Sequence, residues 1–252
     1  MTNQPFSQYL VDRLAQAKHV AVLTGAGISV ESGIPTFRDP DGLWQQFKPE
    51  ELANVRAFLN NPHLVQAWYT HRHMVALEKA PNPGHHALAH LENLFADFLL
   101  ITQNVDNLHQ RAGSKKITEL HGNITRSYCI DCDKTATEQE MEPIASGTAA
   151  QCNACNGYIR PDVVWFGEML PEGAMVQAHA AAQRAEVFLS IGTSAVVYPA
   201  AGIPLLARNY GAYVAEINVE ASAIAGYIDE VVVGKAGEVL PQLVEAVQEK
   251  RS

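Results

Sequence analysis

The four cysteines of this chain, Cys129, Cys132, Cys152 and Cys155, form two C-x-x-C pairs with residues 133–151 between them. Thiolates bind Zn²⁺ tightly, and two such pairs supply the four sulfur ligands of a tetrahedral site. Two disulfides are the alternative, and the lack of a secretion signal at the N-terminus disfavours them. The spacing therefore predicts one structural zinc ion, since four thiolates leave no open position for a reactive water.

A glycine-rich turn, Gly25–Gly27, follows the apolar run Ala21–Leu23. Glycines in such a turn let the backbone approach a ligand closely, and a helix that follows can offer its free N–H groups to a pyrophosphate. The dinucleotide fingerprint G-x-G-x-x-G is incomplete, because Val30 stands at the place of its third glycine. Taken alone, the turn favours a nucleotide site only slightly over a structural strand–helix connection.

The segment that follows, Gly33–Gly42, breaks the helical pattern with two prolines and carries Phe37 and Arg38 in a polar loop. A short connector has no need of a large aromatic side chain and a cation. We therefore interpret this segment as a lid over a ligand.

The overall composition limits the range of functions. The chain has 252 residues, of which 47% are hydrophobic, and a formal net charge of −9. This length allows a large α/β core, and no apolar run approaches the roughly 20 residues of a membrane span. The acidic balance disfavours nucleic acid as a specific partner. The amphipathic N-terminus lacks the features of a targeting peptide, so a cytoplasmic location is expected, whereas the sequence leaves the oligomeric state open.

Strand-like and helix-like segments alternate along the chain over short connections. This alternation predicts an α/β fold with a parallel sheet covered by helices on both faces. The predicted strands are 21–23, 98–101, 117–120, 163–166, 187–191, 213–217 and 231–233, and the segment 163–166 is expected to resume the main fold. The predicted helices are 5–18, 85–95, 108–113, 172–185, 199–209 and a terminal helix from 237, with a helix-rich stretch over 49–79.

Polar clusters directly follow five of these strands: GAG, QNVDN, HGN, GTS and NVE. Polar turns after strands are common, so each cluster alone is more often structural than functional. In open parallel sheets, however, ligands bind outside the carboxyl ends of the strands. Five clusters at that edge predict one shared crevice.

In this order, the segments resemble the sirtuin family of NAD-dependent protein-lysine deacylases, and within it the bacterial type of the desuccinylase and demalonylase subclass. The similarity spans residues 18–236, and the combination of motifs is much more specific than any one of them. The matching segments are GAGIS(x4)GIPTFR at 25–38, TQNVDNLH at 102–109, ELHGN at 119–123, VVWFGE at 163–168, GTSAVVYPAAG at 192–202, IN at 217–218 and the cysteine pairs.

The resemblance implies a single catalytic unit whose Rossmann-like parallel sheet has helices on both faces and carries an additional small domain. The large domain would comprise residues 1–40, 85–124 and 161–252. The small domain would combine a helical insertion at 41–84, which selects the acyl group, with a four-cysteine zinc module at 125–160.

NAD is the co-substrate that the resemblance implies. Phe37 and Arg38 would cover the ribose and nicotinamide, and Gln103, Asn104 and Asp106 would hold the ribose and the carboxamide. The implied NAD-binding residues are Gly25, Ala26, Gly27, Ile28, Ser29, Gly33, Ile34, Pro35, Thr36, Phe37, Arg38, Trp44, Gln103, Asn104, Val105, Asp106, Gly192, Thr193, Ser194, Asn218, Val219, Glu220 and Ala236.

His121 would be the general base, with Asn104 and Asp106 as the other catalytic residues. An imidazole suits this role because its ordinary pKa of about 6.5 lets it accept a proton near neutral pH. In the implied reaction nicotinamide leaves, the acyl oxygen attacks the ribose, His121 deprotonates a ribose hydroxyl, and water releases free lysine and O-acyl-ADP-ribose. Outside its ELHGN context this histidine would more often be an ordinary hydrogen-bonded loop residue.

Acyl-lysine proteins or peptides are the implied substrates. Two segments, VVWFGE at 163–168 and AVVYPA at 195–200, would pair with an extended peptide, a mode of binding that tolerates varied sequences. The implied substrate-binding residues are Val164, Phe166, Gly167, Glu168 and Val197, together with Tyr69 and Arg72.

Tyr69 and Arg72 stand three apart on a predicted helix and so share one face. In the subclass that removes succinyl and malonyl groups, a Tyr-x-x-Arg reads the acyl carboxylate, which a guanidinium can bind with two hydrogen bonds. Spacing alone favours an ordinary amphipathic helix with the arginine in solvent. Because of the family resemblance and the motif's place between the lid segment and Pro81, we prefer the interpretation that Tyr69 and Arg72 bind the acyl carboxylate.

Three other activities are compatible with parts of this pattern. An NAD-dependent ADP-ribosyltransferase or glycohydrolase would use the same crevice without the peptide-pairing segments. A metal-dependent deacetylase would need His121 and Asp106 on a catalytic zinc, which four clustered thiolates argue against. A non-catalytic NAD-sensing zinc protein would have no need of His121, Asn104 and Asp106 together.

Overall fold

The computed structural model describes residues 4–35 and 52–251. Its main sheet has six parallel strands in the order β3-β2-β1-β6-β7-β8. The strands are β1 (His19–Thr24), β2 (Asp97–Thr102), β3 (Ile117–Glu119), β6 (Val187–Ile191), β7 (Tyr213–Asn218) and β8 (Glu230–Val233). The predicted parallel sheet is confirmed, because six of the seven predicted strands fall on these segments.

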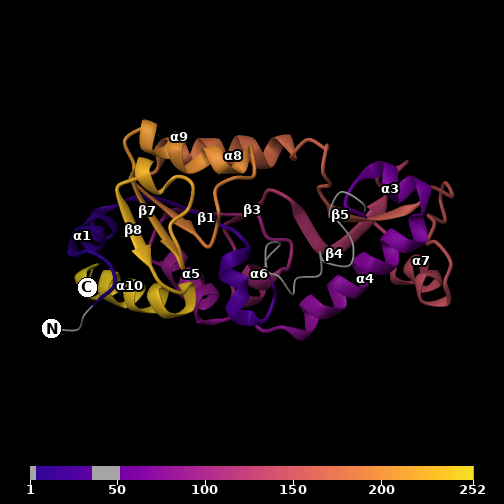
Figure 1. The fold of residues 1–252 in the computed structure, drawn as a ribbon, viewed down its shortest axis with the longest axis horizontal. Helices are drawn as coiled ribbons and strands as arrows, with labels where there is room; N and C mark the ends of the chain where they lie inside the picture. Colours follow the sequence, from indigo (N-terminus) through magenta and orange to yellow (C-terminus); the bar gives the residue numbers. More distant parts are fainter. Residues whose placement is uncertain (1–3, 36–51, 252) are drawn as a thin grey trace.

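Helices cover both faces of this sheet (Figure 1). One face packs against α1 (Gln8–Gln16), α5 (Pro83–Asn93) and α10 (Ala236–Arg251), and the other packs against α8 (Glu172–Arg184) and α9 (Ile203–Asn209). The strands are apolar on both faces, as a doubly covered parallel sheet requires. None of the described helices is long and apolar enough to cross a membrane.

A smaller lobe lies at the other end of the molecule in Figure 1. Its antiparallel pair consists of β4 (Gly122–Cys129) and β5 (Ile159–Val163), and its main helix is α4 (Pro62–Glu78). The short helices α3 (Val55–Asn60), α7 (Glu138–Met141) and η3 (Glu142–Ser146) complete it.

The prediction that the chain resumes the main fold at residues 163–166 is wrong. Val163 pairs with Gly122 of β4, and Trp165 is buried in the smaller lobe, beside Phe58 and Tyr69. The chain rejoins the main fold at α8. An apolar run of this length is compatible with a strand in any sheet, and only its partners decide which.

Short helices shape the connections at the carboxyl edge of the sheet. They are η1 (Ala26–Ser32), α6 (Leu108–Ala112), η4 (Ala200–Gly202) and η5 (Ala225–Tyr227). The turn after β1 leads into the 3₁₀ helix η1, where the sequence pattern indicated an ordinary helix. Asn82 caps α5 by accepting hydrogen bonds from the Gly84 and His85 N–H groups, and Gly113 ends α6 with a φ of 106°.

Glycines are required where the turns after β1 and β6 meet. The Gly27 N–H donates to the Gly192 carbonyl at 2.8 Å, and a Cβ on Gly27 would lie 2.7 Å from that same oxygen. Gly192 has a φ of 58°, and a Cβ there would lie 2.4 Å from the Ile28 nitrogen. These glycines therefore allow two backbones to touch, which adds a second reason for the motif beside ligand approach.

Gly192→Ala is expected to lower the free energy of unfolding by about 3 kcal/mol, because it adds left-handed strain to a backbone overlap. Gly173→Ala is the matched control, since a Cβ there meets nothing within 4 Å. Urea unfolding of both variants measures the difference. Equal stabilities would contradict the close contact.

Candidate active site

The turns after β1, β2, β3 and β6 lie together at the carboxyl edge of the sheet, where hydrogen bonds join them. The Gln103 N–H donates to the Thr24 carbonyl, and its side-chain Nε2 donates to Thr193 Oγ1 at 3.0 Å. The Leu120 N–H in turn donates to the Thr102 carbonyl. Turns from four strands are thereby linked into one continuous surface.

His121 lies at the end of β3 with its ring orientation fixed. Its Nδ1 is 2.9 Å from the Gln103 carbonyl oxygen, and because a carbonyl can only accept, Nδ1 carries the proton. Nε2 is then left with a lone pair. Burial lowers the pKa of His121, and the hydrogen bond to Gln103 opposes part of this effect. The side chain is therefore a neutral imidazole with a free acceptor, which is the form that a general base needs.

Asn104, Ser29 and Asp106 form a hydrogen-bonded group beside it. Asn104 Nδ2 donates to the Gly25 carbonyl at 3.1 Å and to Ser29 Oγ at 3.3 Å, and Ser29 Oγ donates to Asp106 Oδ2 at 2.7 Å. The Leu108 N–H binds the other carboxylate oxygen at 2.9 Å. Burial raises the pKa of Asp106, although these hydrogen bonds counteract it. The structure thus brings the predicted polar residues after β1 and β2 together.

His85 belongs to this group and was missed by the sequence analysis. The Asn82 N–H donates to its Nδ1, so Nε2 carries the proton and faces Ser29 Oγ at 3.5 Å. Burial lowers the pKa of His85 to about 4, so the ring is neutral at physiological pH. A histidine on the apolar face of α5, one turn before Leu88, was the only signal in the sequence.

The turns after β6 and β7 lie on the other side of the glycine contact. Asn218 Nδ2 donates to the Thr193 carbonyl at 3.2 Å, and Ser194 accepts a hydrogen bond from the Ala223 N–H. Val219 and Glu220 are exposed. These residues extend the group of polar turns from the end of β6 to the end of β7.

The remaining predicted cofactor residues have mixed positions. Ile28 is buried, and its carbonyl accepts from Asn82 Nδ2. Ala236 is buried at the start of α10 beside Gly84. Val105 lies between Asn104 and Asp106, and its carbonyl accepts from the Ile124 N–H. Gly33, Ile34 and Pro35 end the first described part of the chain, and Thr36, Phe37, Arg38 and Trp44 lie outside the described residues.

Tyr69 and Arg72 share a face of α4, as predicted. Tyr69 is 3% exposed, and its hydroxyl oxygen accepts a hydrogen bond from Trp165 Nε1 at 3.0 Å. The Arg72 guanidinium lies 5.5 Å from the Tyr69 ring centre and 4.6 Å from that of Trp68. Burial raises the pKa of Tyr69 and lowers that of Arg72. The arginine is therefore held against two aromatic rings, not extended into solvent.

The predicted peptide-binding segments carry exposed apolar side chains. Phe166 is 59% exposed and Val197 is 47% exposed. The Val164 N–H donates to the His121 carbonyl, which links this segment to His121. Gly167 has a φ of 88°, and a Cβ there would meet nothing within 4 Å. The Glu168 carboxylate is occupied, because it accepts two hydrogen bonds from Arg160 and one from the Trp165 N–H.

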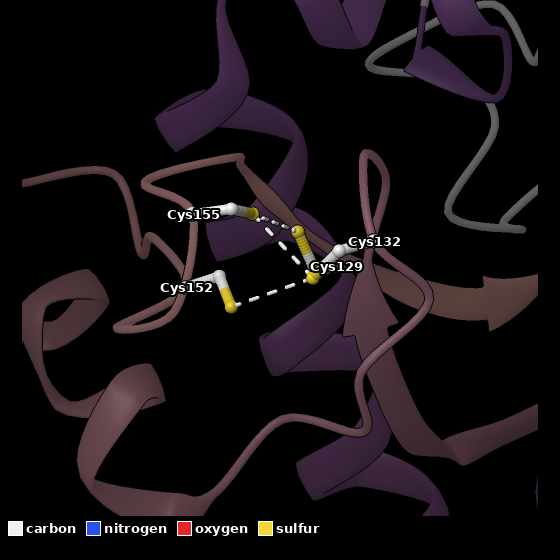
Figure 2. A group of neighbouring side chains, drawn as sticks. All are labelled: Cys129, Cys132, Cys152 and Cys155. Atoms are coloured by element: carbon white, nitrogen blue, oxygen red, sulfur yellow. Dashed lines mark hydrogen bonds between the residues drawn. The ribbon is translucent and has the colours of Figure 1, made fainter.

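The four cysteines point towards one another from two knuckles (Figure 2). Their sulfur atoms all lie within 4.8 Å of one another, and none forms a disulfide. A tetrahedral site with Zn–S bonds of about 2.3 Å places sulfurs about 3.8 Å apart. The Asp133 N–H donates to the Cys129 carbonyl, and the Asn156 N–H donates to the Cys152 carbonyl in the same way. The geometry fits one structural zinc ion held by four unbonded thiols.

Comparison with known proteins finds relatives that are similar over most of the chain. A model described as the Sir2 family matches residues 25–199. The chain is 50% identical over 247 residues to NAD-dependent protein deacylase 2 of Pyrobaculum aerophilum, covering 96% of each chain. It is 47% identical to the NAD-dependent protein deacylase of Aquifex aeolicus, covering 92% of this chain and 96% of the relative.

Solved structures agree with these relatives. A Sir2 homologue in complex with NAD superposes with a TM-score of 0.91 at 42% identity, covering 98% of this chain and 96% of the other. A Sir2 complex with a p53 peptide and NAD⁺ has a TM-score of 0.85 at 35% identity, covering 94% and 97%.

Cys155→Ser is expected to reduce bound zinc from one ion per chain towards none and to lower the unfolding temperature, because metal binding stabilises the folded module. Cys155 is exposed, so a lost packing contact would not explain the effect. His121→Ala is the control, and it should retain one zinc ion because His121 is outside the sulfur cluster. Elemental analysis of both purified variants decides. Full zinc occupancy in Cys155→Ser would contradict the assignment.

Proposed function

The chain belongs to the Sir2 family of NAD-dependent protein deacylases, and we propose that it removes acetyl, succinyl and malonyl groups from lysine side chains of proteins. The products are nicotinamide, free lysine and O-acyl-ADP-ribose. The observation that carries the acidic-acyl part is the buried Tyr69 side chain with the Arg72 guanidinium 5.5 Å from its ring centre. The substrates are acyl-lysine proteins or peptides.

NAD binds across the glycine contact in this proposal. The Gly25–Gly27 turn, Thr193 and Ser194 supply backbone N–H and hydroxyl groups for the phosphates and ribose, and Asn218–Glu220 hold the adenosine end. Asn104 and Asp106 lie on the His121 side and hold the nicotinamide ribose and carboxamide. The hydrogen bonds that already link these residues to Ser29 and to the Gly25 carbonyl support this division, because they fix the side chains before the ligand arrives.

Bound NAD supplies an electrophilic ribose carbon and nicotinamide as the leaving group. His121 then accepts a proton from a ribose hydroxyl at Nε2, since Nδ1 is committed to the Gln103 carbonyl. The developing imidazolium keeps its Nδ1–H donor to that carbonyl, so the ring does not have to turn during proton transfer. A zinc ion held by the four cysteines would take no part in the reaction, because four thiolates would leave it no open position for water or substrate.

The extended substrate peptide lies against the segments that carry Phe166 and Val197. Both side chains are exposed and apolar, and they suit the aliphatic stem of an acyl-lysine. Val164 connects this surface to the base, because its N–H binds the His121 carbonyl. The acyl carbonyl can thus be presented towards His121 while the extended peptide lies along Phe166 and Gly167.

A succinyl or malonyl group adds a carboxylate that the Tyr69 and Arg72 pair can bind. The guanidinium offers a planar set of donors, and the buried phenol adds one O–H donor. The hydrogen bonds are stronger here than in water because the surroundings are largely apolar. An acetyl group lacks the carboxylate and uses neither donor.

The pH dependence of kcat/KM tests the role of His121. Because burial lowers its pKa, the neutral form should persist below the ordinary value of 6.5, and activity should fall only when the pH drops below the lowered value. The acid limb of the profile is therefore expected below pH 6.5. His121→Ala should lose turnover at every pH. An acid limb above 6.5 would speak against His121 as the base.

Arg72→Met tests the carboxylate reader. We expect kcat/KM for a succinyl-lysine peptide to fall on the order of 100-fold, because a charged hydrogen-bonding partner is lost. The acetyl-lysine form of the same peptide should change less than about threefold. Arg56→Met is the matched control, since Arg56 is exposed on α3. Equal losses for both peptides in Arg72→Met would refute the selectivity role.

A further inference from the structure

We propose that Trp165 is a positioning residue for acyl selectivity, because it directs the hydroxyl proton of Tyr69 towards the substrate carboxylate. The inference rests on the proposed carboxylate-reading role of Tyr69 and Arg72. It assigns a specific function to a buried tryptophan that the catalytic account does not otherwise use.

The argument begins with the direction of one hydrogen bond. An indole N–H can only donate, so the 3.0 Å contact between Trp165 Nε1 and the Tyr69 hydroxyl makes the tyrosine oxygen the acceptor. The proton of Tyr69 cannot point at Trp165. The favoured orientations of a phenol O–H lie in the plane of its ring, on one side or the other. Trp165 occupies one side, and the proton takes the other.

The Tyr69 proton has no acceptor within the part of the chain that the structure describes, because the hydrogen bond from Trp165 is the only one at this hydroxyl. Tyr69 is also 3% exposed, so bulk water has little access to it. A buried O–H without an acceptor is costly unless a ligand supplies one. A carboxylate meets this need, and the Arg72 guanidinium 5.5 Å from the ring centre supplies the countercharge.

Trp165 is itself held rigidly. Its backbone N–H donates to Glu168 Oε2 at 2.7 Å, and the Arg160 guanidinium lies 3.7 Å from its ring centre. Arg160 binds both oxygens of the same Glu168 carboxylate, at 2.6 and 2.9 Å. The cation over the ring draws electron density from the indole and makes its N–H a stronger donor. Accepting that hydrogen bond polarises the Tyr69 O–H in turn.

Trp165 also fills space, and the test must separate this from its hydrogen bond. It is 2% exposed, and its ring centre lies 5.1 Å from that of the fully buried Phe58. A substitution could therefore act through packing alone. Phe58→Leu is the matched control, because it disturbs the same cluster without touching the bond to Tyr69.

The experiment compares KM and kcat for succinyl-lysine and acetyl-lysine forms of one peptide in the full-length enzyme. Trp165→Phe removes the donor, and site-specific replacement by benzothienylalanine removes it while keeping the size of the ring. Each is expected to raise KM for the succinyl peptide about fivefold, the value of one hydrogen bond, with kcat unchanged. The acetyl peptide should change less than about twofold. Phe58→Leu should affect the two peptides equally.

Equal changes in KM for both peptides in the benzothienylalanine enzyme would overturn the inference, and so would an unchanged succinyl KM. The parent enzyme and Arg72→Met separate this failure from failure of the proposed function. If Arg72→Met selectively impairs succinyl turnover but the Trp165 variants do not, only the positioning role falls. If Arg72→Met is not selective, the carboxylate reader and the role of Trp165 fall together.

Discussion

The contact between the backbones after β1 and β6 is the constraint on which the site depends. Gly27 and Gly192 approach closely enough for a direct N–H to carbonyl hydrogen bond, which no side chain at either position would allow. This contact places Thr193 within reach of Gln103, whose carbonyl then orients His121. The position of His121 thus depends on a glycine pair two strands away. Side chains at these two positions would hold the turns after β1 and β6 further apart.

The smaller lobe fixes the position of one face of α4. Gln66 of α4 makes three buried hydrogen bonds, two to Ala150 and one to Ile159, on either side of the second cysteine pair. One turn later on the same helix, Tyr69 meets Trp165. The module that carries the four cysteines therefore supports the part of α4 that carries Tyr69.

Much of this arrangement follows from local sequence. The six strands of the main sheet are short apolar runs with polar residues directly after them, and parallel packing brings those residues to one edge. The cysteine spacing also sufficed to predict the sulfur cluster. Segment 163–166 was expected in the main fold and lies in the smaller lobe, because its partner, β4, is distant in sequence and leaves no local trace. His85 was missed for a related reason, since its role depends on Ser29, which the fold alone brings near. The hydrogen bond from Trp165 to Tyr69 also leaves no trace in the sequence, although each residue lies within a motif of the family.

The most direct test of the central claim uses the purified protein, NAD and an equal mixture of acetyl-lysine and succinyl-lysine forms of one peptide. Mass spectrometry of the ADP-ribose products identifies which acyl group is transferred. The account predicts both O-acetyl- and O-succinyl-ADP-ribose, with the succinyl product formed faster. Formation of O-acetyl-ADP-ribose alone would contradict the carboxylate reader, and formation of neither product would contradict the deacylase mechanism itself.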